Sequence, residues 1–281
     1  MRSRVGRFAH LGLKVVAVAA DVVRSPRPGV TVLEYHRVGG GTSLELDLES
    51  SVFAAQMKWL VENCLPVSLD AAVDLLERGP AAATSDIADS RRPVVVTFDD
   101  GTADFMQHAL PALVQHNVPA TYYVATKFVD EQVPFPNDGT PLTWGGLAEA
   151  ISTGLVTVGS HTHSHAVLDK VEVDDARDEV QRSVDLIGEH LGVAADHFAY
   201  PKGVFGGDGV HEVLRASMRS AALAGGGANP FGGTDLFRLD RVPVQRSDAM
   251  AFFRRKAEGG LALEGAVRQV LNRRRYRTAA N

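Results

Sequence analysis

The segment VVVTFDDG at residues 94–101 constrains the fold more than any other part of the chain. Its β-branched and aromatic residues suit a buried strand. Asp99 and Asp100 follow at once, and two adjacent carboxylates at the end of an apolar strand repel each other unless a cation compensates their charge. Gly101 indicates a tight turn. A buried strand that ends in polar side chains is typical of sites in α/β proteins.

The rest of the chain alternates predicted strands with predicted helices. Strands are expected at residues 31–35, 65–68, 94–98, 120–125, 155–159, 197–200, 221–224 and 236–244. Residues 79–93 and 127–141 lack periodicity and are expected to be loops. The alternation predicts an α/β fold, a distorted (β/α) barrel with about seven parallel strands.

The bulk composition excludes several classes of protein. The 281 residues are 45% hydrophobic, which suits a globular domain with a sizeable core. A net charge of −5 argues against a nucleic-acid partner, which would need a basic face. The single cysteine, Cys64, excludes an intrachain disulfide framework and a cysteine-rich metal site.

The two ends of the chain differ from its centre. We expect an N-terminal amphipathic helix at 1–27, the barrel at 28–258 and a basic tail at 259–281. Lys14 and Asp21 interrupt the first apolar run, so there is no clear signal peptide. We expect a cytoplasmic protein or one that is peripheral at the inner membrane face. In the second case the arginine-rich ends would make weak contact with anionic lipid, although such ends are more often solvated.

A second polar cluster, HTHSH at 161–165, follows the strand predicted at 155–159. His161 and His165 lie four residues apart and can converge from a helix or a loop. Together with the aspartates they offer neutral imidazoles and a carboxylate, which suit zinc, cobalt, nickel or iron(II). A lone histidine is usually structural, but three in five residues after a strand favour a metal site. His163 has the wrong spacing for a ligand, and we expect it to support the loop.

These motifs resemble a known family. TFDDG at 97–101 and SHTHSH at 160–165 resemble the first two signatures of polysaccharide deacetylases, carbohydrate esterase family 4. FAYPKG at 198–203 and EYHRV at 34–38 resemble the branch with an early Tyr-His pair, similar to poly-N-acetylglucosamine deacetylases. The resemblance implies a barrel and a metal-dependent hydrolase. Its expected reaction removes N-acetyl groups from amino sugars of a polysaccharide, oligosaccharide or glycoconjugate, with zinc as the expected metal.

The resemblance also implies roles for individual residues. Asp99 is the expected base, acting on the water that the metal activates. His36 is the expected acid for the leaving amine, because the chain has no histidine after His211 that could match the late histidine of other members. The expected metal ligands are Asp100, His161 and His165.

The third motif departs from the usual pattern at two positions. Ala199 stands where an arginine that tethers the base is usual, and we predict that Arg241 of DRVPV takes over this role. Lys202 stands where tyrosine is usual; its backbone N–H would still serve as the oxyanion donor, and its side chain would add a positive charge for an anionic substrate. The expected substrate-binding residues are Tyr200, Pro201 and Lys202.

Two other functions stay open at this point. The FAYPxG form is shared more widely, which allows a related amidohydrolase that acts on a small non-sugar amide. The departures at 199 and 202 allow a catalytically silent carbohydrate-binding module. The intact set of two aspartates and two histidines favours an enzyme.

Overall fold

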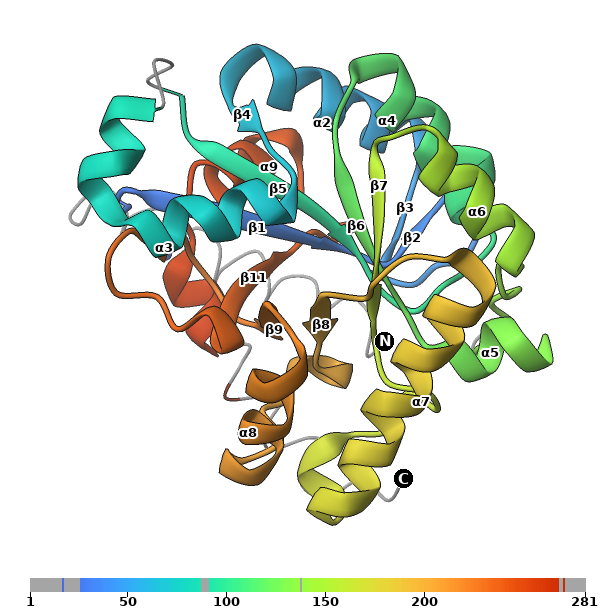
Figure 1. The fold of residues 1–281 in the computed structure, drawn as a ribbon. Coiled ribbons are helices and arrows are strands. Elements are labelled where there is room, and N and C mark those ends of the chain that lie inside the picture. Colours follow the sequence, from blue (N-terminus) through green and yellow to red (C-terminus); the bar gives the residue numbers. More distant parts are fainter. Residues whose placement is uncertain (1–16, 18–25, 87–90, 137, 268–269, 271–281) are drawn as a thin grey trace.

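The computed structural model describes residues 17, 26–86, 91–136, 138–267 and 270. Seven parallel strands close into a barrel in the order β1-β11-β9-β8-β7-β6-β5, with β5 pairing back onto β1 (Figure 1). The predicted α/β barrel is therefore confirmed. The barrel strands are β1 (Gly29–Tyr35), β5 (Pro93–Phe98), β6 (Ala120–Val124), β7 (Val156–Ser160), β8 (His197–Ala199), β9 (Ser220–Ala224) and β11 (Leu239–Pro243).

Four short strands extend this framework. β4 (Leu65–Pro66) adds to β5 in parallel, and β10 (Asn229–Pro230) pairs with β1 in the antiparallel sense. β2 (Arg37–Val38) and β3 (Asp47–Leu48) form a separate parallel pair directly after β1. These additions lie at the ends of barrel strands, so they leave the closed ring intact.

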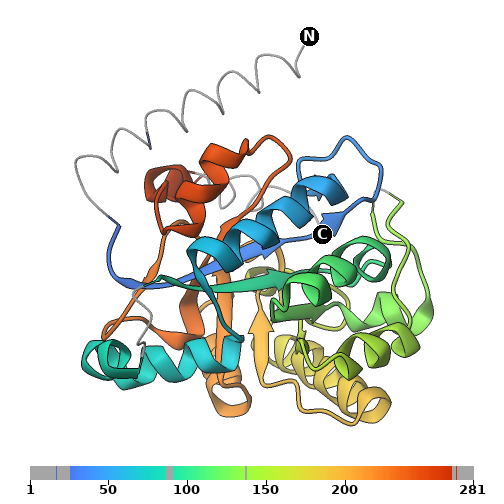
Figure 2. The same cartoon turned by 90° about the horizontal axis from the view of Figure 1, so that it is seen from above.

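Helices surround the barrel, as the view from above shows (Figure 2). The α-helices are α2 (Ser50–Asn63), α3 (Leu69–Asp86), α4 (Leu110–His116), α5 (Thr126–Glu131), α6 (Trp144–Ser152), α7 (Val173–Leu191), α8 (Asp208–Ser217) and α9 (Met250–Ala257). A π-helical turn, η1 (Phe105–Ala109), precedes α4, and 3-10 turns occur at η2 (Leu168–Lys170), η3 (Pro201–Gly203) and η4 (Leu236–Arg238).

The barrel interior is filled by one cluster of buried side chains. It takes residues from six of the ring strands, among them Val32 of β1, Val95 of β5 and Tyr123 of β6, together with residues of α3. Because side chains alternate along a strand, Glu34 and Asp99 continue the inward-facing series of β1 and β5. Both carboxylates therefore reach the interior at the carboxyl ends of their strands.

An aromatic cluster holds the outer face of the strand that carries the aspartates. The ring of Phe98 lies 5.4 Å from that of Tyr35 and 4.9 Å from that of Phe105. Both partners are buried, at 0% and 1% exposure. Edge-to-face and stacked contacts of this kind add about 0.5–1.5 kcal/mol each beyond their buried area. Asp99 thus follows directly from a residue with little freedom to move.

The predictions of secondary structure were wrong in three places. Helix α3 continues to Asp86 through a break at Gly79, whose φ is 77°, where a loop was expected. Pro80 can begin a new helical turn after such a break, and the alanines that follow favour helix. Helix α5 lies in the expected loop after β6, and η4 replaces the beginning of the last expected strand.

The predicted N-terminal helix at 1–27 lies almost entirely outside the described residues, as do the arginines of the tail. Its boundaries, the membrane contact and the cellular location stay predictions. Among the helices within the described ranges, none has the length and apolar character that crossing a bilayer requires.

Candidate active site

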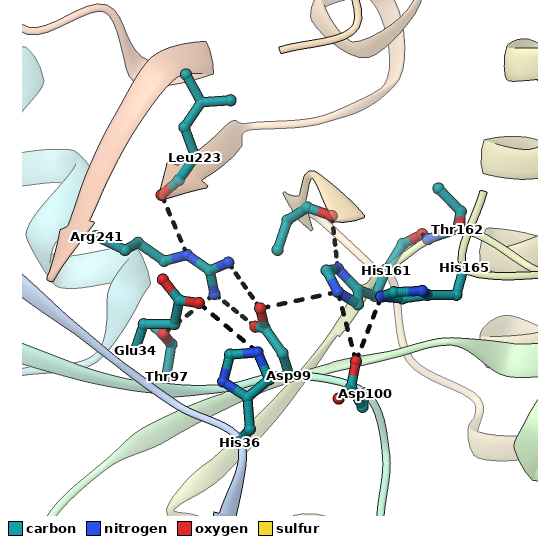
Figure 3. Close-up of polar contacts among 12 residues, drawn as sticks. Glu34, His36, Thr97, Asp99, Asp100, His161, Thr162, His165, Leu223 and Arg241 are labelled. Carbon is teal, nitrogen blue, oxygen red and sulfur yellow. Dashed lines mark hydrogen bonds and ion pairs between the residues drawn. The ribbon is translucent and has the colours of Figure 1, made fainter. Parts of the chain in front are cut away.

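The predicted site residues meet at the carboxyl end of the barrel. His36 follows β1, the two aspartates follow β5, His161 follows β7, and Arg241 lies on β11 (Figure 3). Parallel strands of a closed barrel bring their carboxyl ends to one rim, which explains why residues far apart in the sequence converge.

Asp100, His161 and His165 form a compact group of side chains that could hold a metal ion. Oδ1 of Asp100 lies 3.4 Å from Nε2 of His165 and 3.9 Å from Nε2 of His161. The three ligand atoms all lie within 4.8 Å of one another. The histidines converge from a loop, not from a helix, and both Asp100 (φ 76°) and His165 (φ 63°) adopt left-handed backbone conformations. Such conformations are unfavourable for non-glycine residues and cluster at functional sites.

The protonation of His161 is fixed by its second nitrogen. Nδ1 lies 2.7 Å from the carbonyl oxygen of Ala199, which can only accept, so Nδ1 donates and the lone pair of Nε2 faces the aspartates. Burial lowers the pKa of His161, and burial together with His161 lowers the pKa of His165 to about 3. Both imidazoles are therefore neutral near pH 7, which is the form that binds metal.

This donor set fits a divalent transition metal. Bonds of about 2.1 Å in tetrahedral geometry separate two ligand atoms by about 3.4 Å. The 3.4 Å and 3.9 Å separations around Asp100 lie near that value. Three protein ligands would leave further coordination positions for water and substrate, which is the arrangement of catalytic sites and not of structural ones.

Asp99 is paired with Arg241 on both carboxylate oxygens. Arg241 is fully buried and Asp99 is 3% exposed, with N···O distances of 2.5 Å and 2.8 Å. Arg241 also donates to the carbonyl oxygen of Leu223. Burial alone would raise the pKa of Asp99, but the guanidinium outweighs it and holds that pKa well below its usual range. Asp99 is therefore an ionised, oriented carboxylate, and Arg241 lies where the predicted tether was required.

His36 reaches the same interior from the other side of Asp99. Nε2 of His36 lies 3.7 Å from Oε1 of Glu34, two residues earlier. One nitrogen of His36 and one oxygen each of Glu34 and Asp99 lie within 4.8 Å of one another. Sequence reasoning missed Glu34, although a carboxylate inside the apolar segment TVLEY was a visible signal.

The third motif contributes less than was predicted. The side chains of Tyr200 and Pro201 are enclosed by protein, and the ring of Tyr200 packs edge-to-face on Phe198 at 5.3 Å. Tyr200 therefore presents no surface to a substrate, and Pro201 is buried. Lys202 is exposed with a left-handed backbone, φ 58°. His163 lies outside the metal-binding group, and its Nδ1 is 3.1 Å from Oγ1 of Thr126, which agrees with a role in supporting the loop.

Comparison with known proteins agrees with this geometry. The family model for polysaccharide deacetylases matches residues 86–221, which include both aspartates and both predicted histidine ligands. Residues 86–221 thus carry a polysaccharide deacetylase domain. This domain supports a hydrolase of the carbohydrate deacetylase class, with acetylated carbohydrate as its class of substrate.

Individual relatives cover different shares of the chain. YxkH of Bacillus subtilis, named as a polysaccharide deacetylase, is 25% identical over 226 residues, which are 79% of this chain and 74% of YxkH. A peptidoglycan-N-acetylglucosamine deacetylase of Bacillus cereus is 29% identical over 115 residues, 41% of this chain and 38% of that protein. The structure of the Streptococcus pyogenes deacetylase PplD in complex with acetate superimposes with a TM-score of 0.69 at 19% identity, covering 82% of this chain and 99% of PplD. That likeness shows a shared fold.

Proposed function

We propose that this protein is a divalent-metal-dependent N-deacetylase that removes acetyl groups from amino sugars of a polysaccharide, oligosaccharide or glycoconjugate. The observation that carries the proposal is the Asp100–His161–His165 group beside a second, arginine-paired aspartate. The name of the Bacillus cereus relative, an N-acetylglucosamine deacetylase, supports the choice of an acetamido sugar.

The metal would be held by the Asp100–His161–His165 group, with zinc as the expected ion and cobalt, nickel or iron as alternatives. When bound, a divalent cation polarises the amide carbonyl and makes water a better nucleophile. Asp99 takes a proton from the attacking water, and its ionised state makes it ready to do so. Arg241 keeps both oxygens of Asp99 in place during this transfer.

The second half of the reaction requires a proton for the departing nitrogen. As the C–N bond breaks, His36 gives a proton to that nitrogen, acetate leaves, and the sugar keeps the free amine. The backbone N–H of Lys202 is the proposed donor to the developing oxyanion. The positive side chain of Lys202 would favour sugars that carry an anionic group.

Acetate release tests the proposal directly. Purified protein with added zinc should release acetate from N-acetylglucosamine oligomers, and a chelator should stop the release. Asp99→Asn should lose activity but keep its zinc, whereas Asp100→Asn should lose both. A protein that binds zinc but releases no acetate from any acetylated sugar would refute the proposal. Release of acetate from small non-sugar amides alone would instead identify the protein as an amidohydrolase of that substrate class.

A further inference from the structure

Glu34 is a buried carboxylate that the mechanism above does not use. It is 7% exposed and lies on the inward-facing side of β1, after the apolar Val30 and Val32. A carboxylate in such a position is unfavourable unless cationic groups lie close to it. Glu34 is therefore best explained by the groups around it.

Two cationic or potentially cationic side chains face Glu34. The first is Arg241: burial would lower the pKa of its guanidinium, but Asp99 and Glu34 raise it above its ordinary value. The second is His36, whose Nε2 is 3.7 Å from Oε1 of Glu34. Figure 3 shows Glu34 between these two side chains. Arg241 already donates two hydrogen bonds to Asp99, so of these two side chains His36 is the one that Glu34 is better placed to orient.

A second cation beside the proposed metal is the competing explanation of this cluster, since Glu34, His36 and Asp99 could supply three ligand atoms. Arg241 argues against it. Its guanidinium donates to both oxygens of Asp99 from a fully buried position and would repel a divalent ion bound to the same carboxylate. The cluster is thus better suited to holding an imidazole than a metal.

We propose that Glu34 is a positioning residue that orients the imidazole of His36 for proton donation to the leaving amine. This inference rests on the proposed function. Glu34 acts through His36 and leaves the attack of water to Asp99. In the step concerned, His36 loses a proton to the nitrogen whose bond to the acetyl carbon breaks, and Glu34 neither gives nor takes a proton. Before the next turnover, Asp99 returns its proton to solvent and His36 takes one up from solvent, so the protons balance.

Substrates with different leaving groups isolate this step. An N-acetylglucosamine oligomer needs protonation of its leaving nitrogen, whereas the phenolate of 4-nitrophenyl acetate leaves without a proton. Both substrates need the same attack by water. A loss of proton donation should therefore slow amide hydrolysis and spare ester hydrolysis.

The test compares Glu34→Gln, which keeps the shape and removes the charge, with the wild-type zinc enzyme. We expect kcat for the oligomer to fall roughly 10-fold or more, with kcat for the ester and the zinc content unchanged within about twofold. His36→Ala should show the same split with a larger loss, and Glu34→Asp should recover part of the amide rate. Glu62→Gln, on the exposed face of α2, is the matched control and should change neither rate.

Three results separate the inference from the proposed function. Equal losses on both substrates would place Glu34 with Asp99 and overturn its assignment to His36. An unchanged amide rate in Glu34→Gln would also overturn it, while leaving the deacetylase proposal intact. Absence of amide hydrolysis in the wild type would refute the proposed function itself. If Glu34→Gln unfolds, Glu34→Asp, which moves the carboxylate away from His36, should show a smaller loss on the oligomer with the ester rate unchanged, and equal losses on both substrates would overturn the inference.

Discussion

Replacing Arg241 by methionine should destabilise the protein because it leaves a charge buried without a partner. Asp99 is 3% exposed and accepts hydrogen bonds from Arg241 at 2.5 Å and 2.8 Å. Removing one member of a buried ion pair typically costs about 3–5 kcal/mol, because the remaining charge keeps its desolvation penalty. We expect a loss of this size in the free energy of unfolding, measured by urea denaturation at pH 7.

The loss should depend on pH in a definite direction. In the wild type the pKa of Asp99 is depressed, so its contribution is present above the unfolded-state value of about 3.9 and is lost as the pH falls further. In Arg241→Met, burial raises the pKa of Asp99, so the penalty is present above that raised value and shrinks as the carboxyl becomes protonated. The difference between the two proteins should therefore be largest at neutral pH and decrease towards pH 4.

A double variant identifies the source of the loss. If the unpaired charge is responsible, Asp99→Asn combined with Arg241→Met should be more stable than Arg241→Met alone. Arg241→Lys keeps the charge but not the two-pronged contact, and should fall between the wild type and the methionine variant. A loss below about 1 kcal/mol, the same at pH 5 and pH 8, would refute the reasoning.

Three further predictions concern other parts of the barrel. Gly159→Ala should lower the free energy of unfolding by about 1–3 kcal/mol in urea titrations, because the new methyl group would lie 2.6 Å from the carbonyl oxygen of His197 and 2.7 Å from the ring of Tyr123. His165→Ala should abolish tight zinc uptake in equilibrium dialysis, whereas His163→Ala should bind like the wild type. Burial lowers the pKa of His197, so its contribution to stability is complete above about pH 6.5 and falls below it; His197→Gln should make the denaturation midpoint less sensitive to pH between 5 and 7.

The candidate metal site of Asp100, His161 and His165 could be predicted from the sequence because its chemistry is local. Two aspartates after a buried strand and two histidines in one short loop each signal a site, and barrel topology brings them to one rim. Arg241 could be predicted for a different reason: Ala199 replaces the usual tethering arginine, and Arg241 lies on the last strand of the barrel, 142 residues from Asp99. Glu34 was missed: its place inside TVLEY was a signal, but the groups that surround it follow from the β1–β5 register, which sets it opposite Thr97.

The third motif shows how a block of sequence can mislead. Its residues were taken together as a substrate-binding segment, but side chains alternate along β8. Ala199 faces the barrel interior, while Phe198 and Tyr200 pack outward in a cluster that includes Val180 of α7 and Leu214 of α8. Applying the alternation would have placed Tyr200 on the outward face with Phe198. Lys202 lies beyond the strand, in η3, where the alternation no longer applies.

The two ends of the barrel show that residue types alone do not make a site. At the amino ends of β8 and β9, Nδ1 of His197 lies 2.9 Å from Oγ of Ser220, and its Nε2 lies 3.2 Å from Oδ1 of Asp70. These are the residue types of a serine hydrolase triad, yet Ser220 is 0% exposed and Arg219 also binds Asp70. A nucleophile that no substrate can reach has no catalytic use, so this network serves stability. At the opposite rim, Asp100 and His36 remain partly exposed, and the polar cluster there can meet a substrate.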